Sequence, residues 1–425
     1  MNTSGIAVRH RLPALAGAAV ALLGGLYAAL LLLGVPVAAP PSPVEDVHGP
    51  VMVFGFAGTL IALERAVALG RAWALCAPAA SALGAVILLV TGPSYPGRLL
   101  MVIAPVALLV VYRALWLRQR SVALLAQAAG AFAWYAAAFL WLAGYTVPEI
   151  VPWLVTFVVA TIGGERLESA QVAFLGRRSP EVWFRAALAA LVLTATAATV
   201  APRSGTVLFG LALLAVTAWL VVFDVARRTI RSNGLPRYAA AGLLAGYAWL
   251  ALAGLLWAGA GPVSEGPRYD AALHAVFLGF VVSMIFVHAP VILPAVLRRP
   301  LPYHPVLYLP LVLLHVSLLV RVGLGDAAGL EPVWRWSGTL NIASVLLFAA
   351  CAATTATRAA TTTTRAATTT SASAATRAAT TATRAATTAT RAATTATRAA
   401  TTAGVTTAVT SLRAADAPPE AGANP

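Results

Sequence analysis

The fold is decided by long apolar stretches such as residues 269–297, which read YDAALHAVFLGFVVSMIFVHAPVILPAVL. After Asp270 this stretch contains no Asp, Glu, Lys or Arg up to its end at Leu297. An apolar helix of roughly 20 residues is long enough to cross about 30 Å of hydrocarbon. The stretch is therefore predicted to be a membrane-spanning helix.

The composition of the whole chain agrees with this prediction. Of 425 residues, 60% are hydrophobic and 10% are charged, and the mean hydropathy is +0.83. These values exclude a soluble enzyme and are typical of an all-α integral membrane protein. Twelve apolar runs follow one another along the chain, at residues 12–35, 47–69, 73–92, 99–117, 121–145, 149–175, 181–201, 204–230, 237–260, 269–297, 303–323 and 333–353.

The arginines predict which loops face the cytoplasm. All 29 basic residues are Arg, and basic residues are enriched in cytoplasmic loops. Alternate loops contain Arg9/Arg11, Arg71, Arg118/Arg120, Arg177/Arg178, Arg227/Arg228/Arg231 and Arg298/Arg299. We therefore expect a multi-pass protein of the cytoplasmic membrane with both termini in the cytoplasm. Seven Arg lie after Thr357, and most of the remaining excess in the net charge of +15 lies in short loops, where it determines orientation. Membrane lipid is therefore an expected partner and nucleic acid is not.

The end of the chain, residues 354–425, has a different composition from the rest. It consists mainly of Ala, Thr and Arg, and Arg377, Arg384, Arg391 and Arg398 follow a seven-residue period. Large apolar residues are missing from the positions that form a coiled-coil seam, and Thr disfavours an isolated helix. We therefore expect a twelve-helix transmembrane domain at 1–353 and a disordered cytoplasmic tail at 354–425. Contact of the cationic tail with anionic lipid is the alternative.

Histidines are the residues in these spans that most readily bind a metal. His48 begins the second span and His274 lies near the start of the tenth, and both spans are predicted to run from outside to inside. The two side chains are therefore expected at similar depth. Two neutral imidazoles in an apolar site are the usual axial ligands of a six-coordinate haem b. The pair predicts a haem b site, with two interfacial histidines bonded to loop carbonyls as the alternative.

A second pair of histidines lies deeper in the predicted membrane. His288 follows His274 by 14 residues, which places it about 21 Å further along the helix, too far for one haem to join them. His315, in the eleventh span, is expected within about 5 Å of the depth of His288. His288 and His315 are therefore candidate ligands of copper or of a second haem. Structural hydrogen bonding is the other interpretation.

Charged pairs inside the spans leave a further alternative. Glu64-Arg65 and Glu165-Arg166 recur about a hundred residues apart, and Gly55-Phe56, Gly163-Gly164 and Gly279-Phe280 lie in the second, sixth and tenth spans. These similarities indicate a threefold repeat of four-helix units. Ionisable residues inside a membrane are costly and are often functional. They form ion pairs between helices, or they line the pathway of a small-molecule or ion transporter.

Two stretches resemble known haem proteins. Residues 46–52, DVHGPVM, resemble the haem-ligand segment of subunit I of the haem-copper oxidases. Residues 274–285, HAVFLGFVVSMI, together with Arg299-Pro300-Leu301 and residues 318–322, LLVRV, resemble the NnrS family of haem- and copper-associated membrane proteins. The resemblance implies an oxidase subunit I-like fold of three four-helix arcs, in which His48 and His274 hold the haem.

The resemblance also implies a role in electron transfer or in nitric oxide response, with a redox partner protein. Oxidases carry copper-binding His on the sixth and seventh helices, whereas residues 149–201 contain no His. A complete terminal oxidase is therefore not expected, and an oxidoreductase-like activity stays open. The sequence predicts a multi-pass membrane haem protein, with a transporter and a structural subunit of a larger respiratory assembly as alternatives.

The predicted topology can be tested with reporter fusions. A reporter placed after Arg178 should lie in the cytoplasm and one placed after Gly266 should lie outside, because basic loops stay in the cytoplasm. Enzymatic reporters that are active on only one side of the membrane measure both positions. If the reporter after Arg178 lies outside and the one after Gly266 lies in the cytoplasm, the predicted topology is reversed. The predicted sides of all loops and helix ends would then be wrong.

Overall fold

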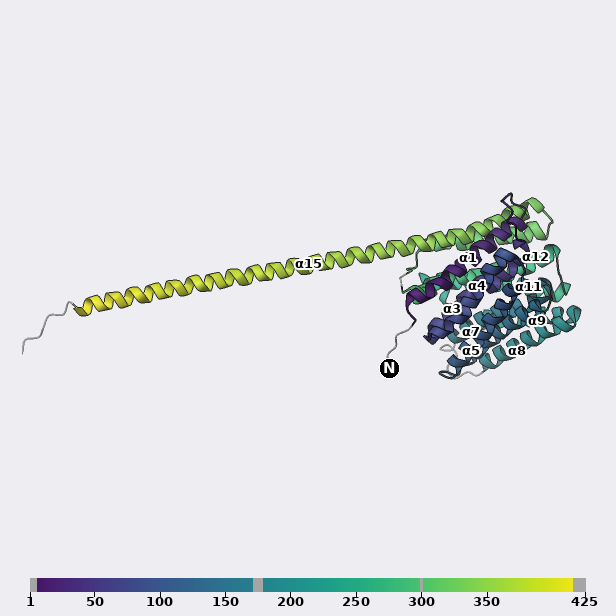
Figure 1. Ribbon diagram of the computed structural model, residues 1–425, viewed down its shortest axis with the longest axis horizontal. Coiled ribbons are helices and arrows are strands. Elements are labelled where there is room, and N and C mark those ends of the chain that lie inside the picture. Colours follow the sequence, from purple (N-terminus) through teal and green to yellow (C-terminus); the bar gives the residue numbers. More distant parts are fainter. Residues whose placement is uncertain (1–5, 171–178, 299–300, 416–425) are drawn as a thin grey trace, which may run out of the picture. The chain divides into compact units, whose positions relative to one another are not determined.

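The computed structural model describes residues 6–170, 179–298 and 301–415, and the regular structure within them is helical (Figure 1). Within these described ranges, twelve helical stretches are long and apolar enough to cross a membrane. The predicted all-α membrane class and the number of spans are therefore confirmed. The stretches are Val8–Leu32, Val44–Leu69, Ala72–Thr91, Tyr95–Trp116, Val122–Leu142, Val147–Ala170, Ser179–Val200, Pro202–Phe223, Leu235–Ala260, Gly266–Leu297, Pro305–Asp326 and Glu331–Arg358.

Several spans are built from more than one helical segment. The first three contain α1 (Val8–Leu32); η1 (Val44–Val47), α2 (His48–Pro50), η2 (Val51–Gly58) and α3 (Thr59–Leu69); and η3 (Ala72–Leu75) and α4 (Cys76–Thr91). Then come α5 (Tyr95–Trp116), α6 (Val122–Leu142), α7 (Val147–Ala170), α8 (Ser179–Val200), α9 (Pro202–Phe223), the short α10 (Ala226–Thr229) and α11 (Leu235–Ala260). The last three contain α12 (Gly266–His274), η5 (Ala275–Val282) and α13 (Ser283–Leu297); η6 (Pro305–Leu307), α14 (Tyr308–Val320) and η7 (Arg321–Asp326); and α15 (Glu331–Ala415).

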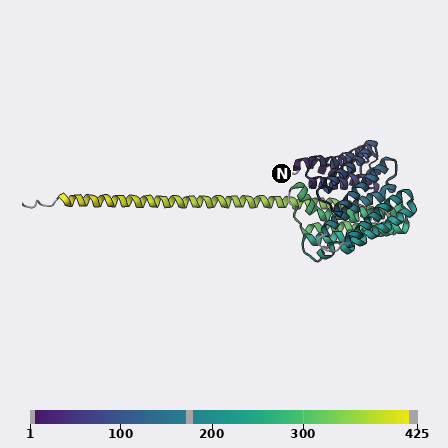
Figure 2. The same cartoon turned by 90° about the horizontal axis from the view of Figure 1, so that it is seen from below.

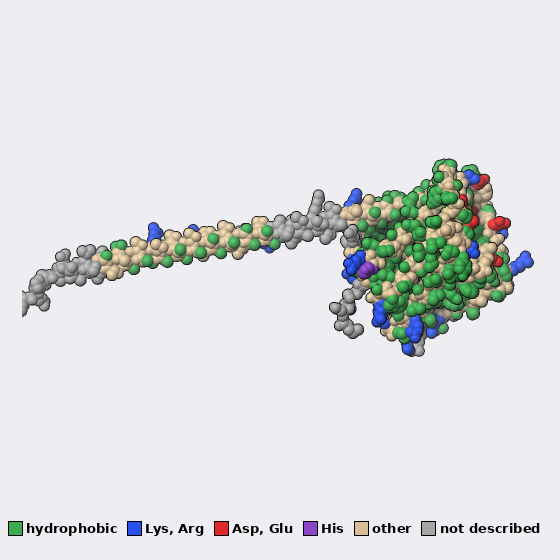
Figure 3. All heavy atoms as spheres, viewed as in Figure 1, with side chains coloured by type: hydrophobic (Ala, Val, Ile, Leu, Met, Phe, Trp, Pro, Cys, Tyr) green, Lys and Arg blue, Asp and Glu red, His purple; other side chains and the backbone are tan. Residues whose placement is uncertain are grey.

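The helices divide into two units, Met1–Thr357 and Arg358–Pro425. In the first unit, helices that follow one another in the sequence pack against each other, and α13 also contacts α1 and α3. The helix α7 is buried along most of its length, whereas large apolar side chains such as Leu193 and Val200 on α8 are exposed. Figure 3 shows hydrophobic side chains over much of the visible face of this unit. An apolar outer surface around an apolar interior is what a bilayer requires.

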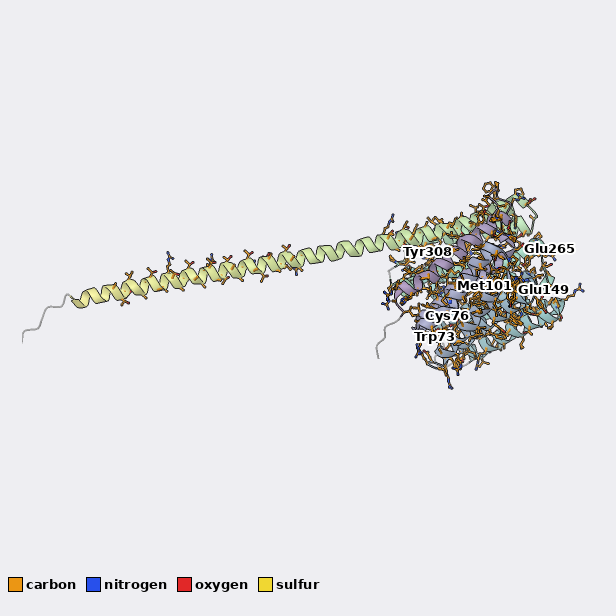
Figure 4. The ribbon with its side chains drawn as sticks, viewed as in Figure 1. Trp73, Cys76, Met101, Glu149, Glu265 and Tyr308 are labelled. Carbon is orange, nitrogen blue, oxygen red and sulfur yellow. The ribbon has the colours of Figure 1, made fainter. Side chains whose placement is uncertain are left out.

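Charged side chains gather at the two ends of this unit. On the face shown in Figure 3, most Arg side chains lie at one end and the Asp and Glu side chains at the other. Figure 4 places Trp73 and Cys76 at one end and Glu149 and Glu265 at the opposite end. This separation matches the predicted division into a basic cytoplasmic face and an outer face. The orientation itself stays a prediction.

Three spans contain π-helical segments, which are often found at functional sites. The segment η2 follows His48 after two residues, and η5 follows His274 directly. Both have eight residues, with Gly-Phe at the fifth and sixth positions (Gly55-Phe56 and Gly279-Phe280). The third, η7, begins at Arg321. The second and tenth spans therefore share a local backbone form as well as a short sequence similarity.

The prediction of a disordered tail is wrong up to Ala415. The helix α15 continues through this region without a break (Figure 2). Ala favours helix, and Thr hydroxyls donate to carbonyls four residues earlier, as between Thr387 and Thr383 at 2.8 Å. Because the helix is already formed within the last span, no new nucleation cost arises. All described side chains from 373 to 408 are nevertheless exposed, so tertiary packing does not stabilise that part.

Removal of the chain after Thr357 should leave the first unit intact. The exposed part of α15 buries no apolar surface, so we expect unchanged membrane insertion and an unchanged midpoint of thermal unfolding. The amount of protein in the membrane fraction and its unfolding in detergent measure both. Truncation after Trp336, which removes the last span, is the control and should lower both. A comparable loss after truncation at Thr357 would show that the tail supports the membrane domain.

Candidate functional site

A cavity of about 400 Å³ lies between the second and tenth spans and contains both His48 and His274 in its lining. Its volume falls within the roughly 300–1,000 Å³ that is usual for small-molecule sites. We call it the His48–His274 cavity. Most of the side chains that line it are apolar, among them Leu26, Val53, Phe56, Val151, Leu154, Phe277, Ile342 and Val345. A smaller polar part contains Glu45, Asp46, Asp270, Arg321, Trp334 and Asn341.

His48 is oriented by the first span. Its Nδ1 lies 2.9 Å from the carbonyl oxygen of Gly25 in α1. A Cβ atom at Gly25 would lie only 2.4 Å from Sδ of Met52, so glycine allows α1 to approach η2 at this point. A carbonyl oxygen can only accept, and Nδ1 of His48 therefore carries the proton.

His274 is oriented by the preceding turn of its own helix. Its Nδ1 lies 2.9 Å from the carbonyl oxygen of Asp270 and 3.1 Å from the carboxylate oxygen Oδ1 of the same residue. Both are acceptors, so Nδ1 of His274 is also protonated. Among the described residues, Nε2 of His48 and Nε2 of His274 have no hydrogen-bond partner. In a neutral ring of this tautomer, Nε2 has a free lone pair and is suited to bind a metal.

Asp270 is in turn held by two other elements. Arg321 of η7 donates from Nε and Nη2 to the two carboxylate oxygens, at 2.8 and 2.7 Å. Trp334 of α15 donates to Oδ2 at 3.1 Å, and the Arg321 guanidinium lies 5.1 Å from the centre of the Trp334 ring. Bidentate Arg–carboxylate pairs have well-defined geometry. The carboxylate next to His274 is therefore fixed by groups from the last two spans.

Sequence reasoning missed the roles of Asp270 and Arg321. From the sequence, Asp270 was noted only as the last charged residue before the apolar part of the tenth span, and Arg321 only as part of the family resemblance. Two signals were available. Asp270 precedes His274 by four residues, which places the two on one face of a helix. Arg321 is an ionisable residue in an apolar span, where such residues need a partner.

The other two histidines belong to different hydrogen-bond networks. Nδ1 of His288 lies 2.9 Å from the Met284 carbonyl oxygen, and its Nε2 lies 3.3 Å from Nη1 of Arg166. His315 accepts from Nε1 of Trp249 at 3.0 Å through Nδ1, and its Nε2 lies 3.2 Å from Oγ of Ser283. All four ring nitrogens are engaged, so a metal would have to replace existing hydrogen bonds. Copper or a second haem at His288 and His315 therefore gains no support from this geometry.

The described residues contain no cluster of three or more His, Cys, Asp or Glu side chains that could hold a metal ion. A metal in the His48–His274 cavity would find two imidazole ligands, Nε2 of His48 and Nε2 of His274. A porphyrin supplies four nitrogens in a plane and leaves two axial positions for protein side chains.

The charged pairs of the second and sixth spans hold helices together. Arg65 pairs with Glu64, donates to Oε1 of Gln127 at 3.1 Å, and lies 3.8 Å from Oε1 of Glu165. These contacts join α3, α6 and α7. None of the four residues lines the His48–His274 cavity. Their arrangement favours structural ion pairing over a lining of that cavity.

Arg166 makes a second set of interhelical contacts. Its Nε lies 3.6 Å from Oδ2 of Asp224 at the end of α9, and Asp224 also accepts from the hydroxyl of Tyr247 in α11 at 2.7 Å. Through its contact with His288, Arg166 also reaches α13. The predicted interhelical partners are therefore present for Glu165, which lies near Arg65, and for Arg166, which lies near Asp224. Glu64 pairs with the adjacent Arg65 instead, so the prediction of a partner on another helix is wrong for Glu64.

Comparison with known proteins places the helical domain in one family. The family model described as domain of unknown function (DUF8744) matches residues 11–357. The match ends at the same residue as the first structural unit. Comparisons with curated proteins and with solved structures found no match.

Replacement of Arg321 by Leu should destabilise the protein strongly. It leaves the carboxylate of Asp270 buried without its charged partner, which typically costs about 3–5 kcal/mol in the free energy of unfolding. The matched control is Arg335→Leu, because the Arg335 and Glu331 side chains are 49% and 69% exposed and such pairs contribute about 0.2–1 kcal/mol. Unfolding in detergent measures both variants. Equal losses in the free energy of unfolding would mean that the Asp270–Arg321 pair stabilises the protein no more than the exposed Glu331–Arg335 pair does.

Proposed function

The chain belongs to the DUF8744 family, and we propose that it is a membrane haem protein that holds one b-type haem between His48 and His274. The observation that carries the proposal is the pair of imidazoles in one apolar cavity, each with Nδ1 bonded to an acceptor. This hydrogen bond selects the tautomer that leaves Nε2 available for iron. Orientation by a carbonyl or carboxylate is the usual arrangement for a metal-binding His.

The remaining lining of the cavity fits a porphyrin. Apolar walls suit the macrocycle, and small residues such as Gly49 and Ala57 also line the cavity. Arg321 uses Nε and Nη2 for Asp270, while its Nη1 makes no hydrogen bond with the described residues. That N–H group would remain as a donor for a haem propionate.

Electron transfer is the function that two histidine ligands support best. A bound haem would supply one-electron chemistry, and His48 and His274 would hold its iron. The protein would hold the ring nitrogens in place and exclude water through the apolar walls. Electron transfer is therefore favoured over nitric oxide response, since a gas would first have to displace His48 or His274. A redox partner protein is part of the proposal.

Asp270 would act as the residue that positions His274. Its carbonyl and carboxylate oxygens fix the imidazole, and Arg321 and Trp334 fix the carboxylate. A carboxylate bonded to a ligand histidine also raises the basicity of the ligand. Nδ1 of His48 is bonded instead to the neutral carbonyl oxygen of Gly25. The two imidazoles would therefore differ in how strongly Nε2 donates electrons to a metal.

An oxidase subunit I-like arrangement of three four-helix arcs remains part of this proposal. The sequential packing, with α13 against α1 and α3, supports a closed order of helices. The similar segments η2 and η5 support a repeat relation between the second and tenth spans. Both segments begin within three residues of a candidate haem ligand.

Spectra of histidine variants test the axial pair. Wild-type protein from haem-replete cells should show a low-spin b-type spectrum after reduction with dithionite. His48→Ala and His274→Ala should each lose this signal or convert it to high spin, because one axial ligand is missing. His288→Ala should keep the low-spin signal, since its ring contacts Arg166.

His304→Ala is the surface control, because His304 is exposed, and it should match the wild type. Protein levels and thermal unfolding of every variant separate loss of haem from loss of fold. Colourless wild-type protein would end the haem proposal and favour a transporter. A low-spin spectrum that survives in both His48→Ala and His274→Ala would eliminate the assigned ligands.

A further inference from the structure

A second cavity, of about 370 Å³, lies beside the first turns of α11 and α14. Its lining includes Asn233, Gly234 and Arg237 from the start of α11 and the turn before it, and Tyr303 and Tyr308 from the start of the eleventh span. We call it the Arg237 cavity. It shares no lining residue with the His48–His274 cavity.

The two tyrosines that line the Arg237 cavity, Tyr303 and Tyr308, pack against a third, buried tyrosine. Tyr238 is fully buried, and its hydroxyl donates to the Phe286 carbonyl oxygen at 3.3 Å. Its ring centre lies 5.8 Å from that of Tyr303 and 5.1 Å from that of Tyr308. Tyr303 and Tyr308 therefore both contact the buried ring of Tyr238, whose hydroxyl is hydrogen-bonded. These contacts restrict the positions of the two side chains that line the cavity.

The polar groups of the Arg237 cavity are suited to an anion. Four polar side chains line it, those of Asn233, Arg237, Tyr303 and Tyr308, and none of the residues lining it is acidic. Among the described residues, these four side chains have no hydrogen-bond or ion-pair partner. One guanidinium, one amide and two hydroxyls thus offer donors without a bound acceptor. An anion with several oxygens, such as a phosphate diester, matches this set.

The location indicates where such an anion would come from. Figure 4 shows Tyr308 at the end of the helical unit that also carries Trp73 and Cys76, opposite Glu149 and Glu265. This is the end at which the Arg side chains gather (Figure 3), and it is the predicted cytoplasmic face. Two spans begin at the cavity, so it is expected at the depth of the lipid headgroups. Tyr is enriched at this depth.

We propose that the Arg237 cavity binds the phosphate headgroup of an anionic phospholipid. The guanidinium pairs with the phosphate, the two Tyr hydroxyls and the Asn233 amide donate to its oxygens, and the acyl chains lie along the apolar outer surface. Basic pockets between helices at the cytoplasmic face are suited to such headgroups. Because the cavity joins the starts of α11 and α14, a bound lipid stabilises the folded state by linkage. The proposal does not depend on haem.

Lipid binding by the full chain tests this site. Protein purified in a neutral detergent is mixed with phosphatidylglycerol, with phosphatidylcholine or with inorganic phosphate, and bound lipid is counted by native mass spectrometry while thermal unfolding is followed. Phosphatidylglycerol should bind and raise the unfolding temperature, and phosphatidylcholine should do so much less. Arg237→Gln should weaken phosphatidylglycerol binding about tenfold or more, as expected for loss of a charge-assisted hydrogen bond.

Arg231→Gln is the matched control, because Arg231 is an exposed residue nearby that does not line the cavity. It should bind phosphatidylglycerol like the wild type. Tyr308→Phe keeps the edge-to-face contact with the ring of Tyr238 and should weaken binding by a smaller factor. Equal weakening in Arg231→Gln and Arg237→Gln, or none in Arg237→Gln, would overturn the site. Binding of inorganic phosphate without preference for phosphatidylglycerol would assign the cavity to a free solute and overturn the lipid proposal.

Discussion

The structure depends on one constraint, which is that polar groups inside an apolar bilayer must find partners within the protein. Asp270 and Arg321 meet it with a bidentate ion pair that joins the tenth and eleventh spans, and Trp334 adds the twelfth. His48, His274, His288 and His315 can be compared on the same basis. His288 and His315 have both ring nitrogens bonded. His48 and His274 each leave Nε2 without a partner among the described residues, and both line one cavity.

The number of spans could be predicted because composition and length alone decide it. The predicted ends of the spans were less accurate than their number, in particular where a polar residue ends a helix before the apolar run ends. The eighth span was predicted to extend to Ile230, whereas α9 ends at Phe223 and the carboxylate of Asp224 accepts from the backbone N–H of Ala226 in α10. The tail was predicted to be disordered from its Thr content. Its continuity with a stable transmembrane helix, which removes the nucleation step, outweighed that intrinsic preference.

The site could be predicted only in part. The sequence gives the depth of a side chain along its own helix, but it does not show which neighbouring helix that side chain faces. Equal depth was a sound reason to group His48 with His274. The same reasoning grouped His288 with His315, but these two side chains contact different helices. His288 meets Arg166 on α7, whereas His315 meets Trp249 on α11. Tertiary packing selects these partners. Asp270 and Arg321 were missed for the same reason, since they are 51 residues apart.

The positions of the buried arginines bear on the proposed function. In a transporter, buried charges are expected to line the path of the substrate. Here Arg65 and Arg166 are engaged by side chains from neighbouring helices and lie outside the His48–His274 cavity. Of the Arg residues, Arg321 does line that cavity, and it is bound to the carboxylate beside His274. Arg65 and Arg166 therefore serve contacts between helices, and Arg321 serves the orientation of His274. This use of the three arginines supports the proposed cofactor site over a transport pathway.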